Sequence, residues 1–468
     1  MKEKEKKEFY ISRELHFTVR AIAAVLALVL ILLTGRAAIT FCLGLFAKGE
    51  HVVNFPGQGS PIVQVNDRTE ATEPIYIDPS QVVEIARAEI TVAGDVMPHM
   101  PIVRTSQTED GYHFDDIFTY VRSYVTGADY AVANLETTFA GTQNKEYAGF
   151  PDFNSPDQIA AGMQNAGFDM LLTANEQCYN YGIDGLVRTL SVLKNQSLAT
   201  LGTTETKEEP RHVVKDISGV KVGMAAYTFA DISADSKVTL NGHTAGSADG
   251  ALISAFDYDN LSGFYLELEN EIAAMRAKGA DAVVVYIHWG DEYSTGVSDR
   301  QRSIAQKLCD LGVDVIAGSH PHVVQAVDLL TSSVDSDHKT VCAYSLGNLL
   351  SNLRADNVGV GSGNCEDGLL FSFTLAKYND GTVRISAVKL LPIWVMIRGS
   401  GEGRDFYILP LDQNNGNWRG SFDLSDTQLN DAQKSYNRTM ELVTPGLNKI
   451  ISYLAQSDSG LDPSISFG

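Results

Sequence analysis

The sequence has few basic residues for its size. Lys and Arg together number 36 against 58 Asp and Glu, which gives a formal net charge of −22 and a pI near 4.8. The main body of the chain also lacks a dense Lys/Arg cluster. Since proteins that bind a bare phosphate backbone usually present a basic face, this balance excludes nucleic acid as the expected partner.

Cysteine is also scarce, with 5 in 468 residues. Cys178, Cys309, Cys342 and Cys365 show no spacing of the kind that zinc sites use. Cys309 and Cys342 lie in apolar patterns that are typical of small buried residues. The cysteines therefore predict no zinc cluster, and the sequence alone leaves disulfide formation open.

Strongly apolar sequence with a basic flank occurs at the N-terminus. Basic residues within positions 1–20 precede an apolar run over 21–33, and after Arg36 a second apolar stretch reaches Phe46. A spanning helix needs about 20 mainly apolar residues, and positive charge before it keeps the N-terminus inside. We expect a cytoplasmic segment over 1–20 and an uncleaved transmembrane signal-anchor over 21–46, with the main domain extracytoplasmic at the cell membrane. A cleaved signal peptide is the alternative, because Gly35 and Ala37 have cleavage-site spacing.

The rest of the chain divides into a spacer, a domain and an extension. Residues 47–87 carry Pro, Gly, Gln and Asp with little periodicity, which is typical of a spacer. From residue 88 short β-branched runs alternate with helical patterns, which predicts an α/β domain with parallel strands. The expected strands cover residues 90–93, 130–133, 170–173, 222–227, 282–287, 313–317 and 341–345, with helices over 156–166, 185–195, 261–278 and 299–311.

An antiparallel hairpin is predicted toward the end of this domain. Asn379-Asp380-Gly381 separates the apolar patterns of residues 371–378 and 382–390, so the sheet is expected to be mixed. We place the domain at 88–395 and a C-terminal extension at 396–468, with a polar amphipathic helix over 425–442 packed on the domain.

Carboxylates and histidines recur where the expected strands end. In open α/β sheets ligands bind at the carboxyl ends of the strands. Carboxylates together with imidazoles suit divalent metal ions, and two metals about 3.5–4 Å apart can activate water and stabilise displacement at phosphorus. The six residues are Asp95, Glu136, Glu176, His288, His320 and His322.

Two of these residues form the pair His320-Pro321-His322 directly after the apolar run 313–317. In an extended segment, side chains two positions apart project to the same side. We therefore expect both imidazoles to serve neighbouring metal ions, or one metal and one substrate group.

Several motifs occur in a fixed order between about residues 90 and 393. Together they resemble the CapA family, the poly-γ-glutamate-associated branch of the calcineurin-like metallophosphatase superfamily. The resemblance implies a metallophosphatase-like α/β/β/α sandwich with mixed sheets, and a role in making or exporting an anionic poly-γ-glutamate capsule. The motifs are Gly94-Asp95 with Met97, Asn134-Leu135-Glu136, Phe153-Asn154-Ser155-Pro156, His288-Trp289-Gly290 with Glu292, Gly318-Ser319-His320-Pro321-His322 with Gln325, and Tyr344-Ser345-Leu346-Gly347-Asn348.

The resemblance also implies roles for these positions. Asp95 and His322 would bind one metal, and His288 and His320 the other, while Glu136 would take the bridging position. The implied cofactors are one or two divalent metal ions, among which the residues do not distinguish Mn, Fe, Zn and Mg. Asp95, His288 and His320 are the catalytic candidates.

Four more residues are candidates for substrate contact. For Trp289 packing is the alternative, and for Asn154 a loop-forming Asx turn is equally open. The candidates are Asn154, Asn175, Trp289 and Glu292.

Four positions depart from the wider patterns. Met97 stands where a phosphoesterase has a ligating His, and Asn180 replaces an acidic residue. Glu176 replaces a ligand Asn but can still bind a cation, whereas Gln177 replaces a His. The amide of Gln177 does not titrate, so it cannot act as a general acid.

Two hypotheses follow. The first is a membrane-anchored CapA-like hydrolase or transferase in capsule or cell-surface polymer assembly. The second is a non-catalytic polymer-binding or scaffolding subunit with a degenerate site. In both, the expected partners are the membrane, an anionic polymer such as poly-γ-glutamate, and other membrane subunits of a capsule complex.

Overall fold

The computed structural model describes residues 82–143, 145–358 and 363–457, which belong to one compact unit. The predicted N-terminal segment and signal-anchor, over residues 1–46, lie outside the described residues. Within the described ranges, no helix combines the length and the apolar character needed to cross a membrane.

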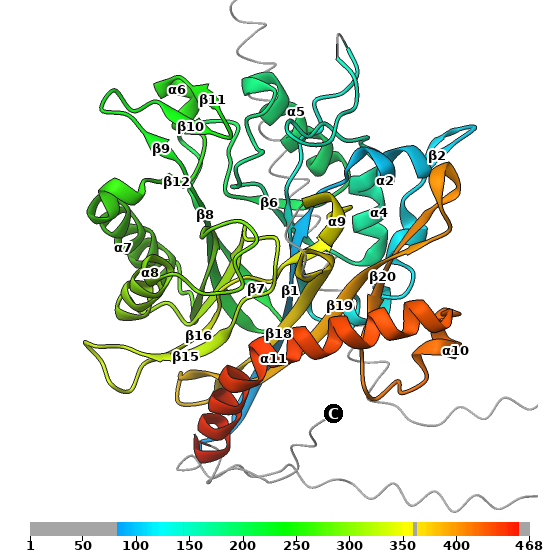
Figure 1. Cartoon of the computed structure of the whole chain (residues 1–468). Helices are drawn as coiled ribbons and strands as arrows, with labels where there is room; N and C mark the ends of the chain where they lie inside the picture. Colours follow the sequence, from blue (N-terminus) through cyan, green and yellow to red (C-terminus); the bar gives the residue numbers. More distant parts are fainter. Residues whose placement is uncertain (1–81, 144, 359–362, 458–468) are drawn as a thin grey trace, which may run out of the picture. The chain divides into compact units, whose positions relative to one another are not determined.

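An eight-stranded mixed sheet forms one half of this unit (Figure 1). Its order is β20-β19-β18-β1-β4-β5-β6, and β17 pairs with β1. The neighbours from β1 to β6 are parallel, whereas β18, β19 and β20 are antiparallel. The strands are β1 (Glu84–Val96), β4 (Tyr130–Leu135), β5 (Met170–Leu172), β6 (Ala199–Leu201), β17 (Asn348–Leu350), β18 (Asp367–Tyr378), β19 (Val383–Arg398) and β20 (Asp405–Pro410).

A seven-stranded mixed sheet forms the other half, in the order β12-β8-β13-β14-β16-β15 with β7 paired to β8. A small sheet, β11-β10-β9, lies apart from both. The large-sheet strands are β7 (His212–Ile217), β8 (Val220–Phe229), β12 (Ala255–Phe256), β13 (Ala282–His288), β14 (Val315–Ser319), β15 (Val327–Thr331) and β16 (Lys339–Ala343), and the small sheet holds β9 (Asp231–Ile232), β10 (Val238–Leu240) and β11 (His243–Ala245).

Helices cover the outer faces of the two large sheets (Figure 1). On the first sheet lie α4 and α5, and on the second α7 and α8. The helices are α2 (Met100–Thr105), α3 (Arg122–Val125), α4 (Gln158–Ala166), α5 (Gly182–Asn195), α6 (Ser247–Gly250), α7 (Leu261–Ala277), α8 (Asp299–Asp310), α9 (Ala355–Val358), α10 (Trp418–Phe422) and α11 (Asp426–Ser457).

Strand β13 shows why the sheets stack as inner layers. Val284 and Tyr286 point into the core between the two sheets, whereas Val283 and Val285 point into the core beneath α7 and α8. Side chains alternate along a strand, so a strand covered on both faces is apolar throughout. The mixed α/β class predicted from the sequence is confirmed.

Two glycines allow close backbone approaches at the carboxyl edge of the strands. A Cβ on Gly94 would lie 1.9 Å from the carbonyl oxygen of Gly347, and one on Gly318 would lie 2.0 Å from that of Tyr344. These contacts are too close for any side chain. The backbone just before Asp95 and His320 is therefore packed so closely that only glycine fits at positions 94 and 318.

The predicted domain boundaries do not coincide with the observed elements. The boundary between residues 395 and 396 falls inside β19, which pairs with both β18 and β20. At the other end, β1 begins at Glu84, within the predicted spacer. These pairings join segments far apart in the chain, so local periodicity does not reveal them.

Helix α11 extends beyond the predicted range 425–442 and packs against β19 and β15. Its Arg438 and Ser435 both bond the buried carboxylate of Asp367, with Oδ1 lying 2.6 Å from Ser435 Oγ. This buried network ties the helix to the start of β18.

Candidate metal centre

All six predicted metal ligands come together where the carboxyl ends of strands from both large sheets meet. Each side chain is largely buried, and Glu176 is the most exposed of them at 14%. The first sheet supplies the carboxylates, from β1 and from the residues after β4 and β5, and the second supplies the imidazoles, from β13 and the segment after β14.

The six side chains divide into two groups, in each of which the donor atoms lie within 4.8 Å of one another, and a third such group, Glu176, Glu292 and His322, overlaps both. The first group is Asp95, Glu136 and His322, and the second is Glu176, His288 and His320. Glu136 Oε1 lies 3.6 Å from His322 Nε2 and 3.9 Å from His288 Nε2, so it faces both groups. This position is consistent with the bridging role predicted for Glu136.

Three buried atoms in this cluster have no hydrogen-bond partner among the described residues: Glu136 Oε1, His288 Nε2 and His320 Nδ1. An unpaired buried polar group costs about 1–3 kcal/mol, and a charged group costs more. Divalent cations would satisfy all three atoms, and mixed carboxylate and imidazole donors suit Mn, Fe or Zn. The residues therefore fit a metal centre.

Amide and hydroxyl groups around the cluster fix its orientation. Asn134 Nδ2 donates to Asp95 Oδ1 at 2.8 Å and to Glu136 Oε2 at 3.3 Å. Ser319 Oγ lies 3.0 Å from His288 Nδ1, which leaves Nε2 of that ring facing the cluster. Such partners orient metal ligands. Asn134 and Ser319 were not predicted to act here, although Asn134 stands two positions before Glu136.

The histidine pair reaches the cluster through an unusual backbone. His320 has a φ of 98° and His322 a φ of 54°, so both lie in the left-handed region. The expectation of an extended segment is wrong, because β14 ends at Ser319. The turn sends His320 to the second group and His322 to the first.

Burial shifts the proton equilibria of the carboxylates upward. Burial, together with the charges of Asp95 and Glu176, raises the pKa of Glu136 well above its usual range. Burial also raises the pKa of Glu176 to about 7. A cation must displace these protons when it binds.

The imidazoles split into two kinds. Burial, reinforced by His322, lowers the pKa of His320 to about 3 and that of His288 well below its usual value. These two rings stay neutral and keep a lone pair for a metal. For His322 burial lowers the pKa, but its hydrogen bond to Asp95 and the surrounding carboxylates outweigh burial and raise it.

Residues 89–353 match the family model described as bacterial capsule synthesis protein PGA_cap, which is more than half of the chain. The chain belongs to this family. The CapA resemblance predicted from the ordered motifs is thereby confirmed.

Two relatives agree with this membership. The chain is 27% identical over 290 residues to the capsule biosynthesis protein CapA of Bacillus anthracis, with 60% of this chain and 63% of that protein covered. It is 25% identical over 300 residues to the PGA biosynthesis protein CapA of Bacillus subtilis (strain 168), with coverages of 64% and 70%. The match thus spans less than two thirds of the Bacillus anthracis protein.

Among solved structures, the Thermus thermophilus sulfate thiohydrolase SoxB in complex with glycerol aligns at a TM-score of 0.34 and 12% identity, covering 74% of this chain and 49% of that one. The protein TT1561 of Thermus thermophilus aligns at a TM-score of 0.29 and 8% identity, covering 60% of this chain and 93% of that one. Neither likeness assigns a function.

The four predicted substrate contacts lie in different surroundings in this PGA_cap chain. Trp289 is fully buried and donates from Nε1 to the carbonyl oxygen of Tyr344, so it is a packing residue. Asn154 is also fully buried and bonds the backbone of residues 140, 141 and 146, which makes it a loop-forming residue. The contacts of both residues favour the packing and loop-forming alternatives over substrate contact.

The other two candidates lie at the cluster itself. Asn175 is buried and donates to Asn134 Oδ1 at 3.0 Å and to the carbonyl oxygen of Leu135, so it supports the cluster from behind. Glu292 has a side chain 43% exposed and lies 3.9 Å from His322 Nε2. Glu292 is therefore the predicted contact that can meet a molecule arriving from solvent.

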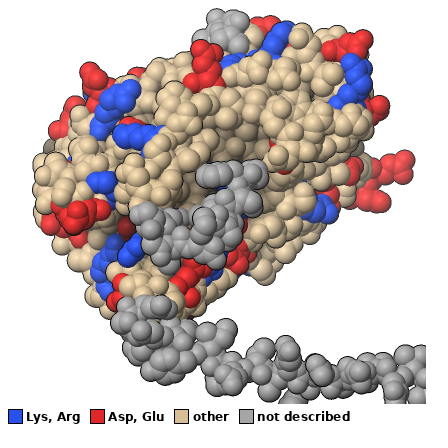
Figure 2. Space-filling model, turned by 90° about the horizontal axis from the view of Figure 1, so that it is seen from below, with Lys and Arg blue, Asp and Glu red and all other residues tan. Residues whose placement is uncertain are grey.

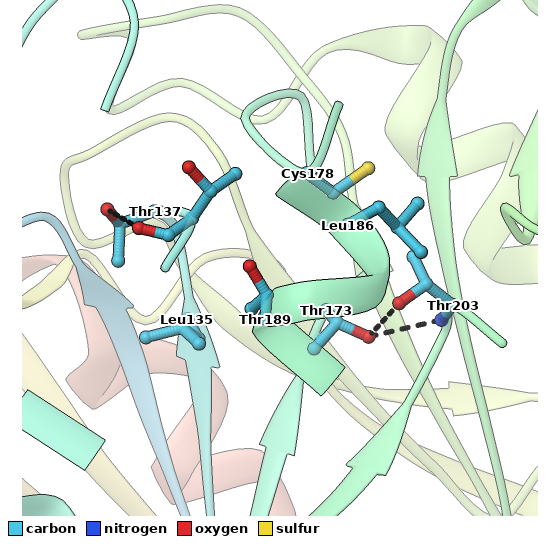
Figure 3. Close-up of a pocket in the computed structure, with 8 residues that line it drawn as sticks. Leu135, Thr137, Thr173, Cys178, Leu186, Thr189 and Thr203 are labelled. Atoms are coloured by element: carbon cyan, nitrogen blue, oxygen red, sulfur yellow. Dashed lines mark hydrogen bonds between the residues drawn. The ribbon is translucent and has the colours of Figure 1, made fainter. Parts of the chain in front are cut away.

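A small cavity beside the start of α5 is separate from the metal centre (Figure 3). Threonines line much of it, and Thr173 Oγ1 accepts hydrogen bonds from the backbone N–H and the hydroxyl of Thr203 at 3.1 and 2.7 Å. None of the six candidate ligands lines this cavity. The hydroxyls of Thr138 and Thr189 donate to the carbonyl oxygens of Phe153 and Gly185, and all of these pairings indicate a structural role.

Proposed function

We propose that this chain is a metal-dependent hydrolase or transferase with a metallophosphatase-like site, acting in the biosynthesis of a cell-surface polymer. The observation that carries the proposal is the pair of donor groups with three orphaned buried atoms between them. An inert scaffold gains nothing from unpaired polar groups at this depth.

Each metal would have its own set of protein ligands. Asp95 and His322 would hold the first, His288 and His320 with Glu176 the second, and Glu136 would bridge. When bound, the metals would polarise a phosphoryl or acyl centre and activate water as a nucleophile.

The chain's own residues restrict the chemistry further. Gln177 can donate a hydrogen bond but cannot supply a proton. The site is therefore best suited to substrates whose leaving group departs without protonation by this position. Glu292 stands at the solvent side of the cluster and would contact the substrate.

The expected substrate or ligand is an anionic polymer such as poly-γ-glutamate. Membership of the PGA_cap family and the names of the two Bacillus relatives support this choice. The face drawn in Figure 2 carries both acidic and basic side chains, and the formal charge of the whole sequence is −22. A polyanion would approach such a surface most readily at bound cations. The proposed setting is extracytoplasmic, with the N-terminal segment as anchor and other capsule-complex subunits as partners.

Metal analysis combined with turnover of a generic phosphoester tests the proposal. Wild-type protein is expected to bind Mn²⁺ and to hydrolyse p-nitrophenyl phosphate. Asp95→Ala and His320→Ala should each lose metal and activity together. Unchanged metal content and unchanged turnover in both variants would contradict the assignment of the site.

A second candidate is the non-catalytic polymer-binding or scaffolding subunit, and Gln177 is the observation that favours it. If the wild-type chain binds Mn²⁺ without turnover while Gln177→His creates activity, this second function is the better description. Turnover by the wild type excludes it.

A further inference from the structure

Three side-chain amides join the loop after β5 to the turn between β10 and β11. They belong to Gln177, Asn180 and Asn241, and we call them the amide cluster. Asn241 and Gly242 form the turn, with φ values of 45° and 79°, as a tight type I′ hairpin requires. Figure 1 shows this small sheet beside α5, which follows the loop.

The orientation of the Asn241 amide is determined by a backbone carbonyl. Asn241 Nδ2 lies 2.9 Å from the carbonyl oxygen of Pro151, which can only accept a hydrogen bond. The nitrogen must therefore lie on that side. The same Nδ2 is 3.2 Å from both Gln177 Oε1 and Asn180 Oδ1.

This orientation propagates to Gln177. Its Oε1 accepts from Asn241 Nδ2 and from Asn180 Nδ2, the latter at 2.6 Å. Rotating the Gln177 amide by half a turn would place N–H against N–H at both contacts and lose both bonds. Gln177 is 3% exposed and Asn180 6%, so the bond between these two amides is shielded from water, whereas Asn241 is exposed.

The amide cluster therefore turns Gln177 Nε2 toward a candidate metal ligand. Nε2 donates to Glu176 Oε1 at 3.3 Å. The other oxygen of that carboxylate, Oε2, lies 3.3 Å from His320 Nδ1, within the second donor group. One oxygen is held by the amide, and the other is left for the cation.

We infer that Asn241 is a positioning residue: from the tip of the β10–β11 hairpin it fixes the Gln177 amide, and through it the Glu176 carboxylate, for metal binding. Gln177 then has a defined task, as an oriented N–H donor in place of a proton donor. The inference rests on the proposed metal centre and adds a segment that contributes no ligand to either donor group.

The experiment is calorimetric titration of the full-length protein with Mn²⁺. Partners behind metal ligands typically contribute about 10–100-fold to metal affinity, so Asn241→Ala should weaken Mn²⁺ binding by roughly tenfold. Thr244→Ala is the matched control, since Thr244 is exposed on the same hairpin and bonds only Thr239 among the described side chains, at 3.0 Å. This control should bind Mn²⁺ like the wild type.

A double-mutant cycle separates positioning from a general effect on folding. If Asn241 acts through Gln177, Asn241→Ala should have no further effect in a Gln177→Ala background. An effect of equal size in both backgrounds would overturn the inference, as would unchanged Mn²⁺ affinity in Asn241→Ala. A wild-type chain that binds no Mn²⁺ overturns the proposed function and this inference together, whereas binding that is insensitive to Asn241 overturns the inference alone.

Discussion

Glu136→Gln should make the metal-free protein more stable while weakening its hold on metal. Glu136 is fully buried, its Oε1 has no partner among the described residues, and burial together with three other carboxylates raises its pKa. Without a cation, the ionised form is strongly disfavoured. A neutral amide of the same shape removes that penalty.

The surrounding atoms suit the amide. Glu136 Oε2 accepts from Asn134 Nδ2 at 3.3 Å, so the amide oxygen would take this place. The amide nitrogen would then take the place of Oε1, which lies 3.9 Å from His288 Nε2 and 3.6 Å from His322 Nε2. Because Gln carries no ionisable carboxyl, it avoids the cost of protonating Glu136 on folding above the unfolded pKa, and we expect a gain of about 1–3 kcal/mol in the free energy of unfolding near neutral pH.

The pH dependence has a definite sign. The pKa of Glu136 is raised in the folded state, so wild-type stability falls as pH rises above the unfolded pKa and keeps falling toward the folded pKa. Gln does not titrate. The advantage of Glu136→Gln should therefore be large at about pH 8 and vanish at about pH 4.

Urea unfolding in EDTA measures the change in metal-free stability, and urea unfolding in excess Mn²⁺ measures how much bound metal adds to the stability of each protein. The order of stability should reverse in Mn²⁺, because a ligand at 100 times its dissociation constant stabilises by about 2.7 kcal/mol and the variant binds it less tightly. Glu267→Gln is the control, a half-buried Glu away from the cluster whose pKa is also raised by burial and which lies 3.5 Å from Arg211 Nε. A Glu136→Gln protein that is less stable than wild type in EDTA, with unchanged Mn²⁺ affinity, would refute the reasoning.

Three further predictions concern proton release, close packing and the C-terminal helix. Because burial raises the pKa of Glu176 to about 7, apparent Mn²⁺ affinity should fall about tenfold per pH unit below that value for each displaced proton, and Glu176→Gln should flatten the calorimetric profile. Gly318→Ala would place a Cβ 2.0 Å from the carbonyl oxygen of Tyr344, so urea unfolding should show a loss of about 1–3 kcal/mol together with weaker Mn²⁺ binding. Arg438→Met removes the charged partner of buried Asp367 and should cost about 3–5 kcal/mol in the same assay, with metal affinity little changed.

The central strands could be predicted because strands that are buried on both faces consist almost entirely of apolar residues. Strand β13 is apolar at every position before His288, since both of its faces are covered. Strand β20 and the continuation of β19 were missed, because antiparallel pairing with distant segments holds them in place. Trp289 shows the same limit at the site: whether an aromatic residue lines a pocket or packs depends on what lies opposite, here Tyr344.

The β10–β11 hairpin has a recognisable local sequence pattern. The sequence Val238-Thr239-Leu240-Asn241-Gly242-His243 contains Asn-Gly between short strand-like runs, which is a strong hairpin signal. Its existence could have been predicted. Its contact with Gln177 could not, because the two positions are 64 residues apart and meet only in the folded chain.

The backbone of the histidine pair explains how the predicted ligand residues come together although the predicted extended geometry is wrong. An extended His320-Pro321-His322 segment would project both rings to one side. The observed groups need the rings to separate, one toward Glu176 and the other toward Asp95. Positive φ at both histidines achieves this, although non-glycine residues in that region are strained by about 1–3 kcal/mol each. A fold that needed only a tight turn after β14 could relieve that strain with glycine at either position. The presence of imidazoles on a strained backbone, with orphaned nitrogens in the same cluster, is best explained by side chains held ready to bind metal ions.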